Sequence, residues 1–161
     1  MRTLVRSVGR ADIGGEPLPP VFRSLDSNKI IFRRAEVSML AGTPGVGKST
    51  LALALALKMK VPSLYVSADT NAHTMAMRLA SMISGKNQTD VETLMNSDYG
   101  WTKATLAKGA HIVWSFESSP TLQDIDEEVQ AFEELWGCPP TAIFVDNLMD
   151  IATDGGEEFA S

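Results

Sequence analysis

The sequence has little cysteine, no long apolar run and no positive charge in its last third. Cys138 is the only cysteine among 161 residues, so an internal disulfide is excluded, and no partner stands at a spacing typical of zinc sites. No stretch approaches the roughly 20 apolar residues that a membrane helix needs, and the first residues lack the pattern of a signal peptide. With 44% hydrophobic residues, we expect a single soluble, cytoplasmic domain and no membrane partner.

The two ends of the chain carry opposite charge. Residues 1–108 hold all 14 Lys and Arg against 8 Asp and Glu, a net charge of +6, whereas residues 109–161 hold 12 acids and a net charge of −12. Two interpretations stay open. Either the acids form a solvated helix face and the cations are scattered over the surface, or the basic part contacts nucleic acid or an acidic neighbouring subunit.

The most specific motif lies at residues 42–49, which match the pattern G-x-x-x-x-G-K-[ST]. An apolar run over 36–41 precedes it, which we predict to be a strand, and an apolar run over 50–57 follows, which we predict to be a buried helix. In such a loop successive backbone N–H groups converge on phosphate oxygens, and glycine permits positive φ and close approach of the backbone. The motif predicts a triphosphate-binding loop made of Gly42, Thr43, Pro44, Gly45, Val46, Gly47, Lys48, Ser49 and Thr50.

Three polar side chains are expected to act on the triphosphate. Lys48 should reach the β- and γ-phosphates as a point charge, and the Ser49 hydroxyl should complete a Mg²⁺ shell otherwise made of phosphate oxygens and water. Asp146 ends an apolar run in the manner of a Walker B strand, and we expect its carboxylate to hold the same Mg²⁺, through a water. Its alternative role is that of a turn or cap residue at a strand end.

Strand and helix patterns alternate along the chain, which is typical of βαβ units and an α/β fold with a mainly parallel sheet flanked by helices. Further strands are predicted over 63–67, 111–116 and 141–146, helices over 71–84 and from Thr121 to Gly137, and helical or mixed structure over 88–108. Residues 1–28, rich in Gly and Pro, are predicted to form an arm or linker. The α/β domain is predicted to comprise residues 29–161.

Asp69 follows the predicted strand over 63–67. A carboxylate at that end of the strand would face the γ-phosphate and orient or deprotonate the attacking water. It would equally serve as the cap of the helix that starts near Asn71, a role that Thr70 could also fill. The residues alone leave both interpretations open.

Residues 37–50, 64–78 and 143–150 together resemble the RecA-like ATPase core of DnaB-type replicative helicases and their phage relatives. The resemblance implies a RecA-like P-loop NTPase fold that binds ATP and Mg²⁺. It also implies single-stranded DNA as a partner, a homo-oligomeric ring with sites between subunits, and a role in DNA replication. In the family a catalytic glutamate follows the second strand, and Asp69 stands in its place. The resemblance therefore favours Lys48, Asp69 and Asp146 as the catalytic residues.

The family's arginine finger and remaining strands follow the Walker B strand, whereas no Lys or Arg follows Lys108 in this chain. Either the C-terminal part is missing, through truncation or a split gene, or the protein is a reduced one that no longer works as a motor. We favour truncation after the strand over 141–146, with residues 152–161 as part of a loop. Two functions remain open: the ATP-hydrolysing core of a DNA helicase, and an ATP-binding regulatory or helicase-loader module with little turnover. A GTPase fits less well, because no N-K-x-D motif follows the loop.

Overall fold

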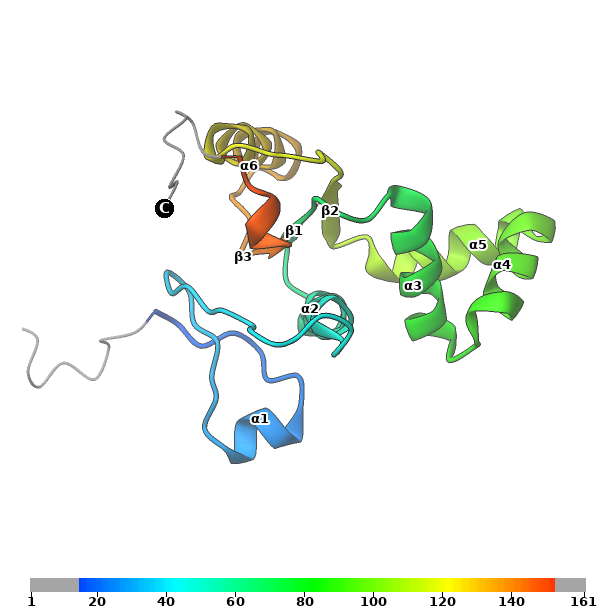
Figure 1. Cartoon of the computed structure of the whole chain (residues 1–161), viewed down its shortest axis with the longest axis horizontal. Helices are drawn as coiled ribbons and strands as arrows, with labels where there is room; N and C mark the ends of the chain where they lie inside the picture. The colour runs from blue at the N-terminus through cyan, green and yellow to red at the C-terminus, as the bar shows by residue number, and fades with distance from the viewer. Residues whose placement is uncertain (1–14, 153–161) are drawn as a thin grey trace, which may run out of the picture.

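A parallel three-stranded sheet forms the centre of the computed structural model, which describes residues 15–152. The strands β1 (Ser63–Ser67), β2 (Ile112–Ser115) and β3 (Ala142–Asp146) lie in the order β2-β1-β3. Both neighbouring pairs are parallel. Parallel strands need crossover connections, and helices provide both of them (Figure 1). The predicted α/β class and the strands over 63–67, 111–116 and 141–146 are confirmed.

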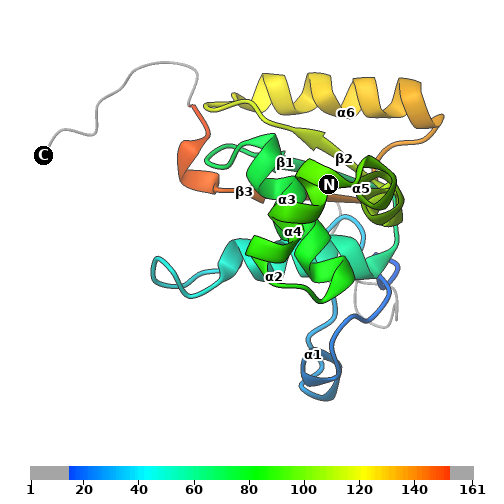
Figure 2. The same cartoon turned by 90° about the vertical axis from the view of Figure 1, so that its right-hand side faces the viewer.

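Helices cover both faces of this sheet (Figure 2). They are α2 (Lys48–Met59) and α3 (Ala72–Ser84) on one face and α6 (Leu122–Trp136) on the other. Side chains of β1 alternate between the two faces, as the pleat of a strand requires. Leu64 and Val66 pack against Phe132 of α6, whereas Tyr65 packs in the cluster that contains Met75 of α3. β1 is therefore buried on both faces. This packing fixes the position of its carboxyl end, from which the next residues of the chain continue.

Local capping chemistry sets the ends of α3 and α6. The side chain of Asn71 accepts a hydrogen bond from the Thr74 N–H at 2.9 Å, and α3 ends at Gly85, whose φ is +71°. At the start of α6, Thr121 and Asp124 form a reciprocal capping box. Both predicted helices are confirmed.

The segment predicted as helical or mixed contains three short helical elements. These are α4 (Gln88–Ser97), α5 (Tyr99–Leu106) and the 3-10 turn η2 (Ala107–Gly109). With the far end of α3 they project away from the sheet (Figure 1). Within residues 15–152, no helix has the length and apolar character needed to cross a membrane.

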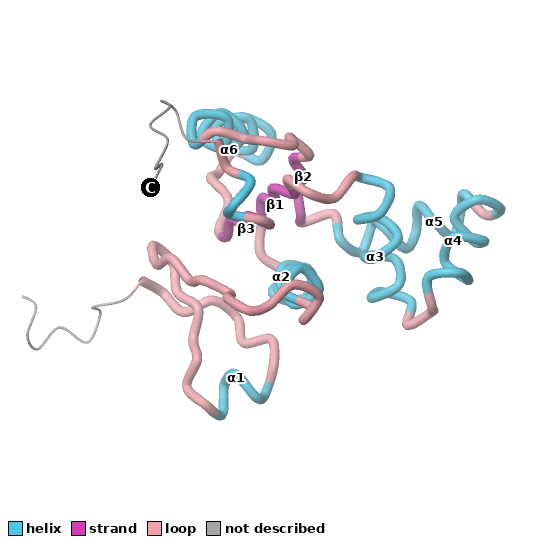
Figure 3. The backbone as a smooth tube through the Cα atoms, in the orientation of Figure 1, coloured by secondary structure: helices cyan, strands magenta, loops and turns pink. Residues whose placement is uncertain are grey.

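The strand predicted over residues 36–41 is wrong. The segment is a loop without strand pairing, drawn pink between α1 and α2 in Figure 3, and Val37, Met39 and Leu40 are exposed. A strand is stabilised by hydrogen bonds to a neighbour about 4.8 Å away. The described strands pair with each other in the order β2-β1-β3, so this apolar run has no strand beside it.

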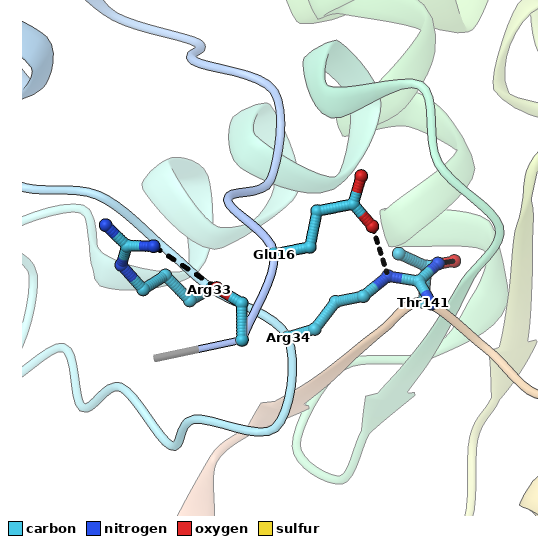
Figure 4. A network of polar contacts seen from close by, with 5 residues as sticks. Glu16, Arg33, Arg34 and Thr141 are labelled. Carbon is cyan, nitrogen blue, oxygen red and sulfur yellow. Dashed lines mark hydrogen bonds and ion pairs between the residues drawn. The ribbon is translucent and has the colours of Figure 1, made fainter. Parts of the chain in front are cut away.

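Part of the predicted N-terminal arm folds back on the chain. Residues 15–28 contain the short helix α1 (Arg23–Ser27), and Pro17 and Arg33 form an antiparallel bridge. Arg34 donates a hydrogen bond to Oγ1 of Thr141 at 3.0 Å and lies 4.0 Å from the Glu16 carboxylate (Figure 4). Arg34, which lies beside Glu16 of the arm, therefore contacts the residue that precedes β3. Residues 1–14 of the arm and 153–161 of the predicted loop lie outside the described residues, and the boundary at residue 28 stays a prediction.

Candidate nucleotide-binding site

The loop over residues 42–49 leads directly into α2, which begins at Lys48. Gly45 has a φ of +78°, and Gly47 has a φ of +96°, in a region that costs a residue with a Cβ about 1–2 kcal/mol. At Gly42 a Cβ would lie 3.0 Å from Cγ1 of Val46, so a side chain there would push Val46 aside. The backbone therefore favours glycine at Gly45 and Gly47 because of their φ values, whereas at Gly42 a Cβ would crowd only the exposed side chain of Val46.

The loop ends at an exposed helix N-terminus. The first N–H groups of a helix have no partner within the helix and carry a partial positive charge, and the N-cap, Gly47, has no side chain that could satisfy them. The Lys48 ammonium donates hydrogen bonds to the carbonyls of Gly42 at 3.0 Å and Thr43 at 3.2 Å, so it lies over the loop. N–H groups and an ammonium arranged in this way suit a phosphate group.

Asp146 joins this loop to the sheet. The Ser49 hydroxyl donates a hydrogen bond to Oδ1 of Asp146 at 3.0 Å, and the Tyr65 hydroxyl donates one to Oδ2 at 2.9 Å. Asp146 is buried, and the register pairs it with Ser67, so the carboxyl ends of β1 and β3 lie level. The structure thus brings together the two residues that the sequence predicts as metal ligands, Ser49 and Asp146.

Tyr65 keeps its proton in this environment. Burial raises the pKa of the Tyr65 phenol well above its usual range, and the Asp146 carboxylate, which accepts its hydrogen bond, raises the pKa further. The charge of Asp69 acts in the same direction, and that of Arg78 opposes it. The phenol is therefore a permanent donor to Asp146.

Ser49 and Asp146 fit the predicted Mg²⁺. A hydroxyl and a carboxylate are oxygen ligands of the kind that this ion prefers, and they lie within hydrogen-bonding distance of one another. Across residues 15–152 there is no group of three or more His, Cys, Asp or Glu that could hold a metal ion. A Mg²⁺ shell here would therefore need oxygens from phosphate and water as well.

Asp69 lies beyond the carboxyl end of β1 and is exposed. Its Oδ1 accepts a hydrogen bond from the Thr70 hydroxyl at 2.8 Å. Because Asn71 caps α3, the alternative roles of Asp69 and Thr70 as helix caps are wrong. The carboxylate is free of that structural task, and its catalytic role stays a prediction.

The contact of Tyr65 with Asp146 was not predicted from the sequence. Tyr65 is an aromatic residue in a buried apolar strand, which by itself indicates core packing. Its contact with Asp146 depends on the register between β1 and β3, because Tyr65 and Asp146 are 81 positions apart in the sequence. The available signal was the hydroxyl of a tyrosine in a strand expected to be buried, since a buried Tyr hydroxyl usually finds a hydrogen-bond partner.

A cavity lies elsewhere in the described residues, on the α6 side of the sheet. It has a volume of about 360 Å³ and is lined by the acidic side chains of Glu117, Asp124, Glu127 and Glu128. Four carboxylates repel a triphosphate. The loop over 42–49 is therefore the better candidate for a nucleotide.

A parallel α/β sheet, a glycine loop at the start of a helix and a buried carboxylate beside its serine define a P-loop nucleotide-binding domain. The family model described as the AAA domain matches residues 13–161, and the chain belongs to this family.

Two phage proteins are similar to the chain. It is 35% identical over 144 residues to the Gene 65 protein of Mycobacterium phage L5, covering 89% of this chain and 54% of that protein. It is 32% identical over 120 residues to the Gene 65 protein of Mycobacterium phage D29, covering 74% of this chain and 52% of that protein. The chain thus spans about half the length of these relatives.

The fold is also similar to a solved structure that is described as an ATPase domain. The TM-score is 0.73 at 15% sequence identity, over 98% of this chain and 58% of that chain. The predicted RecA-like fold is confirmed by this similarity.

Proposed function

We propose that this chain is the ATP-binding and Mg²⁺-dependent ATP-hydrolysing core of a DNA helicase that acts in phage DNA replication. The observation that carries the proposal is the hydrogen bond of 3.0 Å between Ser49 and Asp146. P-loop NTPases hold Mg²⁺ with the serine of the loop and the carboxylate at the end of a neighbouring strand. The same two residue types meet here.

Each polar group of the site has a task in the proposed reaction. Backbone N–H groups of the loop and the Lys48 ammonium bind the phosphates, and Ser49 and Asp146 hold the ion. Mg²⁺ supplies charge neutralisation at the phosphate oxygens when bound. Asp69, exposed at the end of β1, orients the attacking water and accepts its proton.

The helicase part of the proposal is supported by the resemblance of residues 37–50, 64–78 and 143–150 to DnaB-type helicases and by the similarity of the fold to a known ATPase domain. Such motors assemble as rings and bind single-stranded DNA. We propose that a neighbouring subunit, or residues after Ser161, completes the site with an arginine. The net positive charge of residues 1–108 suits a DNA backbone.

The test is ATP hydrolysis by the protein as it is encoded, including any residues that follow Ser161, with and without single-stranded DNA. We expect hydrolysis that DNA stimulates. Lys48→Ala should reduce it by about 10²–10³, and Asp69→Asn by about 10²–10⁴. Asp26→Asn, which removes an exposed carboxylate of α1, is the matched control and should hydrolyse ATP as the unmodified protein does.

Hydrolysis no faster than that of Lys48→Ala would contradict the proposal. Tight ATP binding with no turnover would instead support the regulatory or helicase-loader module. Aspartate is one methylene shorter than the family's glutamate, so the rate of Asp69→Glu is informative as well. A faster Asp69→Glu protein would support the position of Asp69 beside the attacked phosphate.

A further inference from the structure

We propose that Tyr65 is a positioning residue for Asp146: its hydroxyl holds the carboxylate in the orientation that presents Oδ1 to Ser49. This inference rests on the proposed role of Asp146 as a Mg²⁺ ligand. It adds to the site a residue from β1, a strand that contributes nothing to the loop motif itself.

The aromatic ring of Tyr65 has no freedom to turn away. It is fully buried in β1, the central strand. The ring centroid lies 5.0 Å from that of Trp114 on β2 and 5.7 Å from that of Phe144 on β3, and the strand register pairs Tyr65 with both residues. These two aromatic neighbours, one on each side of the ring, fix the position of the Tyr65 hydroxyl.

The two oxygens of Asp146 have different partners. Oδ2 accepts from Tyr65 at 2.9 Å, and Oδ1 accepts from Ser49 at 3.0 Å. A carboxylate with only one of these bonds can rotate about its Cβ–Cγ bond, because that torsion is broad in aspartate. The Tyr65 hydroxyl, by holding Oδ2, therefore determines that Oδ1 of Asp146 faces Ser49.

The substitution Tyr65→Phe separates this role from core packing. It removes the hydroxyl and keeps the ring between Trp114 and Phe144. Phe132→Leu is the matched control, because it disturbs the buried side chains on the opposite face of β1 and leaves the bond from Tyr65 to Asp146 and both ring neighbours of Tyr65 in place. A merely structural hydroxyl would change the unfolding temperature and leave the metal dependence of nucleotide binding unaltered.

The experiment measures ATP binding by calorimetry over a series of Mg²⁺ concentrations and in EDTA, with the protein as it is encoded. For Tyr65→Phe we expect the half-saturating Mg²⁺ concentration to rise about 10-fold. Loss of a residue that hydrogen-bonds to a metal ligand typically weakens metal binding by about 10- to 100-fold, and this is the lower end of that range. Binding in EDTA should stay within about 2-fold, and Phe132→Leu should match the unmodified protein. Equal metal dependence of Tyr65→Phe and Phe132→Leu would overturn the inference.

Asp146→Asn distinguishes failure of the inference from failure of the proposed function. If Asp146→Asn raises the Mg²⁺ requirement and Tyr65→Phe does not, only the role of Tyr65 is refuted. If Asp146→Asn has no effect either, the metal role of Asp146 is refuted, and the inference falls with it.

A second measurement applies even if Tyr65→Phe does not fold. The chain has two tyrosines, and Tyr99 is exposed, so in Tyr99→Phe protein the tyrosine bands of an ultraviolet resonance Raman spectrum come from Tyr65 alone. Adding Mg²⁺ to the ATP complex should shift these bands, because the acceptor of the Tyr65 hydroxyl then shares its charge with the ion. Unshifted bands in a protein whose ATP binding depends on Mg²⁺ would overturn the inference.

Discussion

The substitution Gly47→Ala should weaken nucleotide binding without destabilising the fold. Gly47 has φ +96° and ψ 25° at the N-cap of α2. Gly85 has a comparable backbone, with φ +71° and ψ 9°, at the C-cap of α3. At neither glycine would a Cβ meet an atom within 4 Å. Each substitution by alanine therefore has only the conformational cost of about 1–2 kcal/mol.

We expect this conformational cost to lower the free energy of unfolding at Gly85 and the affinity for nucleotide at Gly47. The N–H of Gly85 donates to the Ser81 carbonyl at 2.9 Å and closes α3, so Gly85→Ala should lower the free energy of unfolding and reduce Tm by roughly 2–8 °C. Gly47 lies in an exposed loop. With alanine the free loop relaxes out of the left-handed region and has to return to it when a phosphate binds. The same 1–2 kcal/mol then raises Kd by roughly 5- to 30-fold.

The assay is a calorimetric titration of both variants with Mg·ATP, together with thermal unfolding followed by circular dichroism. A Kd for Gly47→Ala within 2-fold of the unmodified protein, or an equal rise in Kd for Gly85→Ala, would refute the reasoning. The first result would mean that the left-handed backbone at Gly47 is unnecessary for binding, and the second that the rise in Kd is not specific to the loop.

Three further predictions concern α6. Phe132→Ala should lower the free energy of unfolding by about 3–5 kcal/mol in urea titrations, because Phe132 is fully buried; Leu135→Ala, at 74% exposure, should change it by less than about 0.5 kcal/mol, and equal effects would contradict the packing of α6. Thr121→Ala removes the helix cap and should cost about 1 kcal/mol in the same titration, so an unchanged midpoint would show that the cap is dispensable. Hydrogen bonds from the backbone and side chain of Thr121 lower the pKa of Asp124 below its ordinary 3.8. The stability from Asp124 is therefore present above pH 3.8 and lost as the pH falls through the lowered value. The Tm difference between Asp124→Ala and the unmodified protein should shrink over that range, and a constant difference would contradict the assignment.

Features with a local cause were predictable from the sequence. The start of α6 follows from the pair Thr121 and Asp124, the end of α3 follows from Gly85, and the positive φ at Gly45 and Gly47 follows from the loop motif. Each depends on residues a few positions apart, so a short window of sequence contains the whole interaction.

Features that depend on strand pairing were not predictable in the same way. The apolar run over 36–41 looks like a strand, but an apolar pattern does not say whether a neighbouring strand is present to pair with it. The contact of Tyr65 with Asp146 likewise requires the β2-β1-β3 order and a register that matches Ser67 with Asp146. The contact between Ser49 and Asp146 also joins distant parts of the chain, but it was expected from the sequence. The serine of the loop motif and the aspartate of a Walker B strand both hold Mg²⁺ in P-loop NTPases.

Binding of Mg·ATP to Lys48→Ala tests most directly whether the loop over 42–49 holds the nucleotide. The control is Lys58→Ala, which removes an exposed ammonium from the last turn of the same helix. We expect one ATP per chain for the unmodified protein and for Lys58→Ala, and a loss of most of the affinity for Lys48→Ala. Equal binding by Lys48→Ala and Lys58→Ala would contradict the assignment of this loop as the nucleotide site.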